Sequence, residues 1–85
     1  MNAITKIEIL SEKVRFFSEA VAKTDQAVYC LGNAIYWQGE DDLNHEKEAA
    51  RDALVALSRK AHERLDEANK ELHLALFKLH DEVQS

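Results

Sequence analysis

Apolar residues in the first half of the chain recur at a strict seven-residue spacing. β-Branched residues hold one position of this repeat, at Ile7, Val14, Val21, Val28 and Ile35. The position three residues later is held by Leu10, Phe17, Thr24 and Leu31, of which only Thr24 is polar. Such a pair of positions is typical of a helix that packs along a coiled-coil seam. The pattern predicts one long helix over about residues 5–38.

Local signals predict the start of this helix. Thr5 and Glu8 have the spacing of a capping box, in which two side chains satisfy free N–H groups at a helix start. Ile4 and Ile9 are placed to form the hydrophobic staple that accompanies such a box. We therefore expect the helix to begin at about Thr5.

Two glycines bear on where the first helix ends. Gly39 suits a C-cap, because glycine adopts a positive φ without strain, and we expect a turn over about residues 39–42. Gly32 lies inside the repeat, where glycine destabilises a helix by about 1 kcal/mol relative to alanine. A break at Gly32-Asn33, which would give three helices, is an alternative interpretation.

The second half of the chain predicts another helix, over about residues 43–83. Its apolar residues recur every three or four positions, at Leu54, Ala61, Leu65, Ala68, Leu72, Leu76, Leu79 and Val83. Asp41 or Asp42 is the expected N-cap. A short turn makes the helices antiparallel, so that residues whose numbers add up to about 80, such as Ile7 and Leu72, lie level. The predicted fold class is all-α, a single-domain antiparallel helical hairpin over residues 1–85.

A second apolar series runs along the first helix, and we call it the outer seam. It comprises Ile9, Phe16, Ala20, Ala27, Cys30, Ala34 and Trp37, and Lys23 interrupts it. These residues lie about 100–180° around the helix from Val21, so the first helix is apolar over more than half of its circumference. One returning helix is too narrow to cover that surface. We expect the outer seam to bind protein, either a second copy in a homodimeric four-helix bundle or another helical protein.

Composition narrows the functional classes. The 85 residues carry a formal charge of −5, with 46% hydrophobic residues, 32% charged residues and no proline. Disorder is therefore not expected, and the negative charge argues against nucleic-acid binding, which depends on neutralising phosphates. No run approaches the roughly 20 apolar residues of a membrane span, and no signal-peptide core is recognisable. We expect a cytoplasmic protein without membrane insertion, and export without a cleavable signal peptide is left open.

Candidates for site chemistry are weak. His62, His73 and His80 share one side of the second helix with Asp66, but His73 and His80 are about two turns apart, and one metal ion needs closer ligands. Cys30, the single cysteine, cannot form an internal disulfide, and we expect it to be a small buried hydrophobic residue. No phosphate-binding loop or nucleophile motif is present. We therefore expect no enzyme activity, no metal site and no cofactor.

Acidic residues gather around the predicted turn, at Glu40, Asp41, Asp42 and Glu46. One interpretation is that they stabilise the positive end of the second helix. The other is that they dock on a basic surface of a partner protein.

Trp37-Gln38-Gly39 stands between the two predicted helices, near the centre of the chain. A Trp-x-Gly turn in a helical hairpin of this length resembles the WXG family of small type VII secretion substrates. The resemblance implies antiparallel hairpins that pair into four-helix dimers. It also implies an export signal in which an acidic residue follows an aromatic residue by four positions. Phe77 and Asp81 are similar to that signal, with phenylalanine where tyrosine is usual.

These patterns favour a non-catalytic protein-binding module, resembling a small secretion substrate or targeting partner. A small acidic phage- or plasmid-type inhibitor, or antitoxin-like regulator, that occludes a host protein is the alternative function. RNA-binding hairpin dimers, similar to plasmid copy-number regulators, share the architecture but conflict with the charge of −5. Export that depends on Phe77 and Asp81 would favour the first class, and a target bound to the acidic segment would favour the second.

Overall fold

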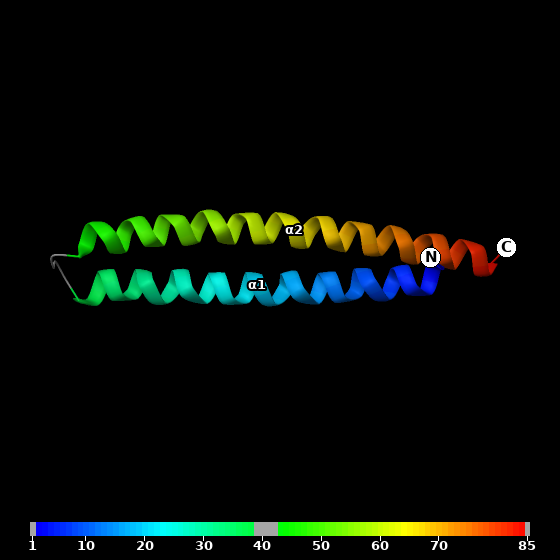
Figure 1. Ribbon diagram of the computed structural model, residues 1–85, viewed down its shortest axis with the longest axis horizontal. Coiled ribbons are helices and arrows are strands. Elements are labelled where there is room, and N and C mark those ends of the chain that lie inside the picture. Colours follow the sequence, from blue (N-terminus) through cyan, green and yellow to red (C-terminus); the bar gives the residue numbers. More distant parts are fainter. Residues whose placement is uncertain (1, 39–42, 85) are drawn as a thin grey trace.

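The protein forms two long helices that fold back on one another (Figure 1). The computed structural model describes residues 2–38 and 43–84, with residues 37 and 38 described by their backbone alone. Helix α1 spans Ala3–Gln38 and helix α2 spans Asn44–Gln84. They run antiparallel in a rod of 66 × 17 × 15 Å, and α2 extends beyond the amino-terminal end of α1 (Figure 1). The predicted all-α helical hairpin is confirmed.

Helix α1 runs without interruption through Gly32, so the three-helix alternative is wrong. A Cβ atom at Gly32 would meet no other atom within 4 Å, so crowding does not require glycine at this position. Leu31 and Ile35, on either side of it, are partly buried. Their packing outweighs the loss of about 1 kcal/mol that glycine brings to a helix interior.

The start of α1 differs from the prediction. The Thr5 N–H donates a hydrogen bond of 2.7 Å to Oδ1 of Asn2, and the Lys6 N–H donates one of 3.1 Å to the Asn2 carbonyl oxygen. Asn2 is therefore the N-cap, because its side chain accepts from the third residue of the helix. The predicted capping box at Thr5 is wrong, since Thr5 already lies inside α1. Ile4 and Ile9 are both exposed and do not form the expected staple.

Helix α2 begins close to the predicted residue. The Lys47 N–H donates a 2.9 Å hydrogen bond to the Leu43 carbonyl oxygen, which places Leu43 at the entry to the helix. The predicted N-caps Asp41 and Asp42, and the predicted C-cap Gly39, lie outside the described residues.

The predicted seven-residue repeat faces α2. Leu10 is buried, and the remaining residues of the repeat from Ile7 to Ile35 are partly buried. Opposite them on α2, Ala61 and Ala68 are buried and Leu65 is partly buried. Alanine at the contact lets the two helix backbones approach closely, and this one seam holds the hairpin together.

Two residues of the predicted α2 series lie outside this seam. Leu76 and Val83 are exposed, whereas Ala75 and Leu79 are partly buried. Successive residues of a helix are turned by about 100°, so only one residue of the Ala75–Leu76 pair fits the seam. Ser58, which the apolar pattern omits, is buried in the seam instead.

Thr24, the polar member of the repeat, is accommodated within α1. Its hydroxyl lies 2.9 Å from the Ala20 carbonyl oxygen and 3.1 Å from that of Val21, and it donates to these backbone acceptors. A satisfied hydroxyl carries little penalty for partial burial. The methyl group of Thr24 is then free to pack in the seam.

A single seam leaves the hairpin with little interior. Among the described residues, the buried apolar side chains are Leu10, Ala61 and Ala68, and no large side chain is completely buried. A protein domain normally surrounds its core with two or more packed layers. One hairpin therefore supplies one layer.

Candidate protein-binding surface

The outer-seam side chains that the structure describes are exposed or only partly covered along α1. Phe16 exposes 66% of its surface and Ile9 50%, while Ala20, Ala27 and Ala34 are partly covered. The Phe16 ring packs edge to face on the Phe17 ring, with 5.4 Å between centroids. Because Phe17 belongs to the seam, this contact fixes the exposed ring of Phe16 beside the helix interface.

Two further members of the outer seam lie near the carboxyl end of α1. Cys30 is exposed, so its predicted role as a buried hydrophobic residue is wrong for the single chain. Trp37 lies within α1, and its side chain falls outside the described atoms.

Helix α2 contributes residues that sequence reasoning missed. Its exposed Leu57 lines a groove of about 300 Å³ that we call the central groove. The central groove is lined by Phe16, Phe17, Ala20 and Thr24 of α1 and by Leu57, Lys60, Ala61 and Arg64 of α2. The register predicted from the sequence could have identified Leu57 and Lys60 as part of this surface, because it places them level with Ala20 to Thr24. Phe16 and Ala20 of the outer seam therefore belong to a surface that both helices build.

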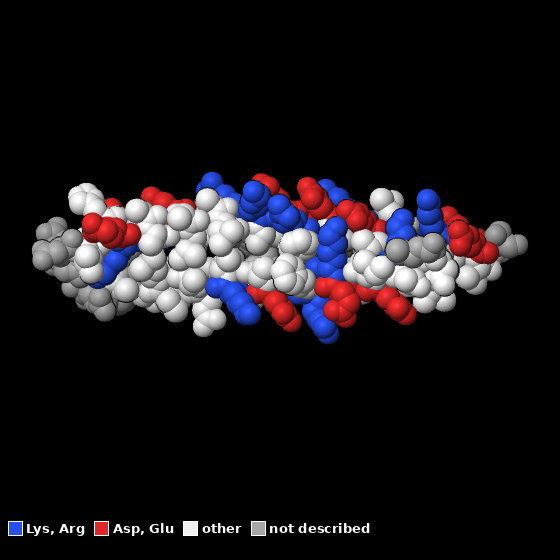
Figure 2. Space-filling model, viewed as in Figure 1, with Lys and Arg blue, Asp and Glu red and all other residues white. Residues whose placement is uncertain are grey.

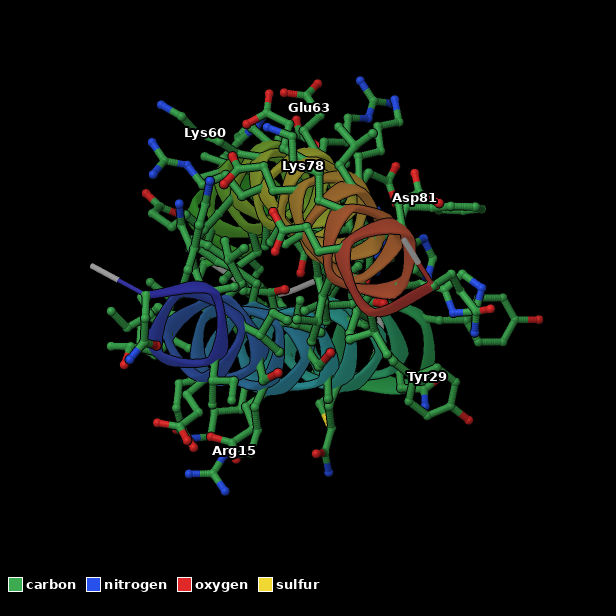
Figure 3. All side chains as sticks on the ribbon, turned by 90° about the vertical axis from the view of Figure 1, so that its right-hand side faces the viewer. Arg15, Tyr29, Lys60, Glu63, Lys78 and Asp81 are labelled. Carbon is green, nitrogen blue, oxygen red and sulfur yellow. The ribbon has the colours of Figure 1, made fainter. Side chains whose placement is uncertain are left out.

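The two sides of the hairpin are distinct. In Figure 3, Lys60 and Tyr29 point to opposite sides, and the Lys60 side is the one that faces the viewer in Figure 2. On that side, charged residues gather over the middle of the rod and over its open end, where the two chain termini lie (Figure 2). The part toward the connection between the helices is mostly uncharged (Figure 2). On this side, charge is therefore denser over the middle of the rod than toward the connection between the helices.

A polar contact joins the helices on the Tyr29 side. The Ser58 hydroxyl of α2 donates a hydrogen bond to Oδ1 of Asp25 on α1, and His62 Nε2 lies 3.2 Å from Oδ2 of the same carboxylate. A carboxylate only accepts, so His62 Nε2 donates. The Ser58 hydrogen bond, and after it the His62 hydrogen bond, holds the pKa of Asp25 below its ordinary value. This contact also reports the register, because level residues have numbers that add up to about 83, within one helical turn of the predicted 80.

This trio does not have the arrangement of a catalytic triad. Ser58 and His62 both donate to Asp25, and a nucleophilic serine would instead donate to the histidine. Among the described residues, no three His, Cys, Asp or Glu side chains gather closely enough to hold a metal ion. The arrangement is suited to joining two helices.

The residues that resemble an export signal come together at the open end of the rod. Phe77 and Asp81 line one groove with Lys6 of α1 and with Leu74 and Lys78 of α2. Phe77 exposes 69% of its surface, and Asp81 is exposed. One end of the hairpin therefore presents an accessible ring beside an acid.

Of the four predicted acidic docking residues, Glu46 is exposed in the first turn of α2. Glu40, Asp41 and Asp42 lie outside the described residues. Docking of this segment on a basic partner stays a prediction.

Within the described helices, no segment is both long enough and apolar enough to cross a membrane. No protein-family model matches the chain, and neither a curated protein nor a solved structure matches it.

Proposed function

We propose that this protein is a non-catalytic binding module that pairs with a second helical hairpin through the outer seam and the central groove. The pair forms a four-helix bundle. The observation that carries the proposal is the row of exposed apolar residues that follows α1 and includes Ile9 and Phe16.

The accessible surface of the chain supports this proposal. A compact protein of 9.7 kDa exposes about 5,100 Å², whereas this chain exposes 6729 Å². The excess is roughly 1,600 Å², and a specific interface removes about 800 Å² from each partner. One interface of ordinary size would bring the exposed surface closer to that of a compact protein.

The placement of the apolar residues supports the same proposal. Phe16 and Leu57 come from different helices and line one groove beside small alanine side chains. Burial of each large apolar side chain contributes roughly 1.5–3 kcal/mol. Helices with small residues at their contact approach closely, which suits a further layer of helices on this side.

Two aspartate substitutions test the proposal. Phe16→Asp or Ala27→Asp places a charge in the outer seam, and we expect at least tenfold weaker association with substantial helicity retained. Tyr29→Asp is the matched control, because Tyr29 is as exposed as Phe16 but points to the opposite side (Figure 3). Sedimentation measures the mass of the assembly, and circular dichroism measures the helicity of each variant. Equal effects at Phe16 and Tyr29 would contradict a binding surface on the outer seam.

The groove at the end of the rod where the chain termini lie supports a proposal about how the module is recognised for export. We propose, from the resemblance to the WXG family, that Phe77 and Asp81 form a recognition signal for export. Phe77→Ala should abolish export from a host with the matching secretion system and leave the mass of the complex unchanged. Leu74→Ala, which alters an exposed residue of the same groove, is the control. Unchanged export of Phe77→Ala would remove the secretion role and leave the binding role.

A further inference from the structure

We propose that the central groove binds an acidic amphipathic helix of another protein. The apolar residues of that helix pack on Phe16 and Leu57, and carboxylates beside them pair with Lys60 and Arg64. This inference rests on the proposed function and adds the chemistry of the partner to it.

The central groove has an apolar floor and a basic rim. Ala61 is buried at its floor and Phe17 is partly buried, whereas Lys60 and Arg64 are exposed. The two basic residues are four positions apart, so they lie one turn apart on the same face of α2. A helix that matches both parts of the groove carries apolar residues with negative charge beside them.

Lys60 and Arg64 are available to a partner. Among the described residues, neither of them forms an ion pair, although Glu63 and Glu67 lie on the same helix. In Figure 3, Glu63 points away from α1, whereas Lys60 points to the side of the hairpin. Lysine and arginine side chains lie over the middle of that side (Figure 2). Unpaired cations beside apolar residues favour a partner that supplies carboxylates.

The apolar surface extends beyond the central groove in both directions. Ile9 lies toward the open end, and Ala27 and Ala34 lie toward the connection between the helices. The distance along α1 from Ile9 to Ala34 is about 38 Å, whereas the groove residues Phe16 and Thr24 are about 12 Å apart along the same axis. A small amphiphile in the groove would leave most of this row exposed. A helix of about 25 residues would cover it.

The groove next to the central groove, toward the open end, differs in charge. It has a volume of about 390 Å³ and shares Lys60 and Arg64 with the central groove. Lys13 and three glutamates, Glu63, Glu67 and Glu71, also line it. Basic and acidic residues are equal in number there, so the preference for carboxylates is confined to the central groove. The acidic residues of the partner therefore lie near the middle of its helix.

A second copy of the chain is less complementary to this surface. The charged residues of the outer seam and the central groove are Lys23, Lys60 and Arg64, and all three are basic and exposed. The charge of this surface is therefore opposite to the net charge of −5 on the chain. Pairing of two copies brings two such basic surfaces together, and like charges at an interface oppose binding. An acidic helix therefore displaces the second copy.

Three synthetic helices test the preference for negative charge. Each has about 25 residues with leucine and alanine along one face, and the residues beside that face over the central turns are glutamate, glutamine or lysine. Fluorescence anisotropy of trace amounts of labelled peptide measures the dissociation constant for the full chain. The glutamate peptide should bind roughly tenfold more tightly than the glutamine peptide, and the lysine peptide should bind most weakly. In sedimentation, the glutamate peptide should replace the two-chain species with one chain bound to one peptide.

Charge reversal on the chain tests where the peptide binds. The double variant Lys60→Glu, Arg64→Glu should reverse the order of the three affinities. The double variant Arg59→Glu, Lys70→Glu is the matched control, because it changes the net charge equally and should leave the order unchanged. Arg59 lines the groove on the Tyr29 side, and Lys70 is exposed and lines neither the central groove nor the groove next to it. Circular dichroism confirms that both variants are folded.

The possible failures are distinct. Equal affinity for the three peptides, or the same reversal of order in the control variant, overturns the acidic partner and leaves pairing through the outer seam intact. A chain that forms the two-chain species but binds none of the peptides overturns the acidic partner and leaves a second copy as the occupant. A chain that forms neither complex overturns the proposed pairing as well.

Discussion

The Ser58 hydroxyl of α2 donates a hydrogen bond to the Asp25 carboxylate of α1. Ser58 is buried in a largely apolar seam, and the Asp25 carboxylate accepts the hydrogen bond of its hydroxyl. Sliding one helix by a turn would leave Ser58 without this partner, and an unsatisfied buried hydroxyl costs about 1–3 kcal/mol. The pair therefore helps to fix the register on which the geometry of the binding surface depends.

Asp25 makes the stability of the hairpin dependent on pH. Ser58 and then His62 hold its folded-state pKa below the ordinary value of 3.8, because both favour the ionised carboxylate. The stabilisation is present above the ordinary pKa and is lost as the pH falls through the folded pKa. We expect the difference in free energy of unfolding between the unmodified chain and Asp25→Asn to shrink in that window. Urea titrations at a series of pH values measure this difference.

Two additional variants make the pH experiment specific to Asp25. A His62→Gln background isolates the Ser58 hydrogen bond from the titration of the histidine. Asp66→Asn removes one exposed carboxylate elsewhere on α2 and controls for the change in net charge. A difference at Asp25 that stays constant over the acidic range would contradict the assigned role.

Asn2 should matter more to stability than Thr5. Asn2→Ala removes the N-cap of α1 and should lower the free energy of unfolding by about 1 kcal/mol. Thr5→Ala should have a much smaller effect, because the Thr5 N–H keeps its acceptor on Asn2. Denaturant unfolding of the two variants compares them, and a larger loss for Thr5→Ala would restore the capping box.

Gly32→Ala should stabilise the protein by about 0.5–1 kcal/mol. Alanine has the higher helix propensity and reduces the entropy of the unfolded chain, and its Cβ atom meets nothing within 4 Å. The midpoint of urea unfolding should rise with an unchanged slope. A lower midpoint would indicate that glycine at this position is required by a close contact of the assembled protein.

The helices and their seam were predictable because the hydrophobic period is strong over most of each helix. The repeat from Ile7 to Ile35 faces α2 in the structure, and the antiparallel register lies within one turn of the expectation. The start of α1 was not predictable in the same way, because Asn2 and Thr5 are both good N-caps. Only the observed hydrogen bond to Asn2 distinguishes them.

The binding surface was predictable only on the helix with a continuous apolar series. Phe16 and Ala20 stand out on α1, whereas Leu57 lies among charged neighbours such as Lys60 on α2, and no repeat marks it. Its place depends on which residues of α1 lie opposite, which is a property of the register. The Asp25–Ser58 contact also depends on the register, because the two residues are 33 positions apart in sequence and meet only when the helices pair.

Sedimentation equilibrium of the unmodified chain is the most direct measurement of whether one hairpin is sufficient. A single chain leaves Phe16, Leu57 and Ile9 exposed, so we expect a species of twice the 9.7 kDa chain mass at micromolar concentrations. Dilution should dissociate this species, and Phe16→Asp should shift it toward 9.7 kDa. A mass of one chain at every concentration up to the millimolar range would contradict pairing through the outer seam.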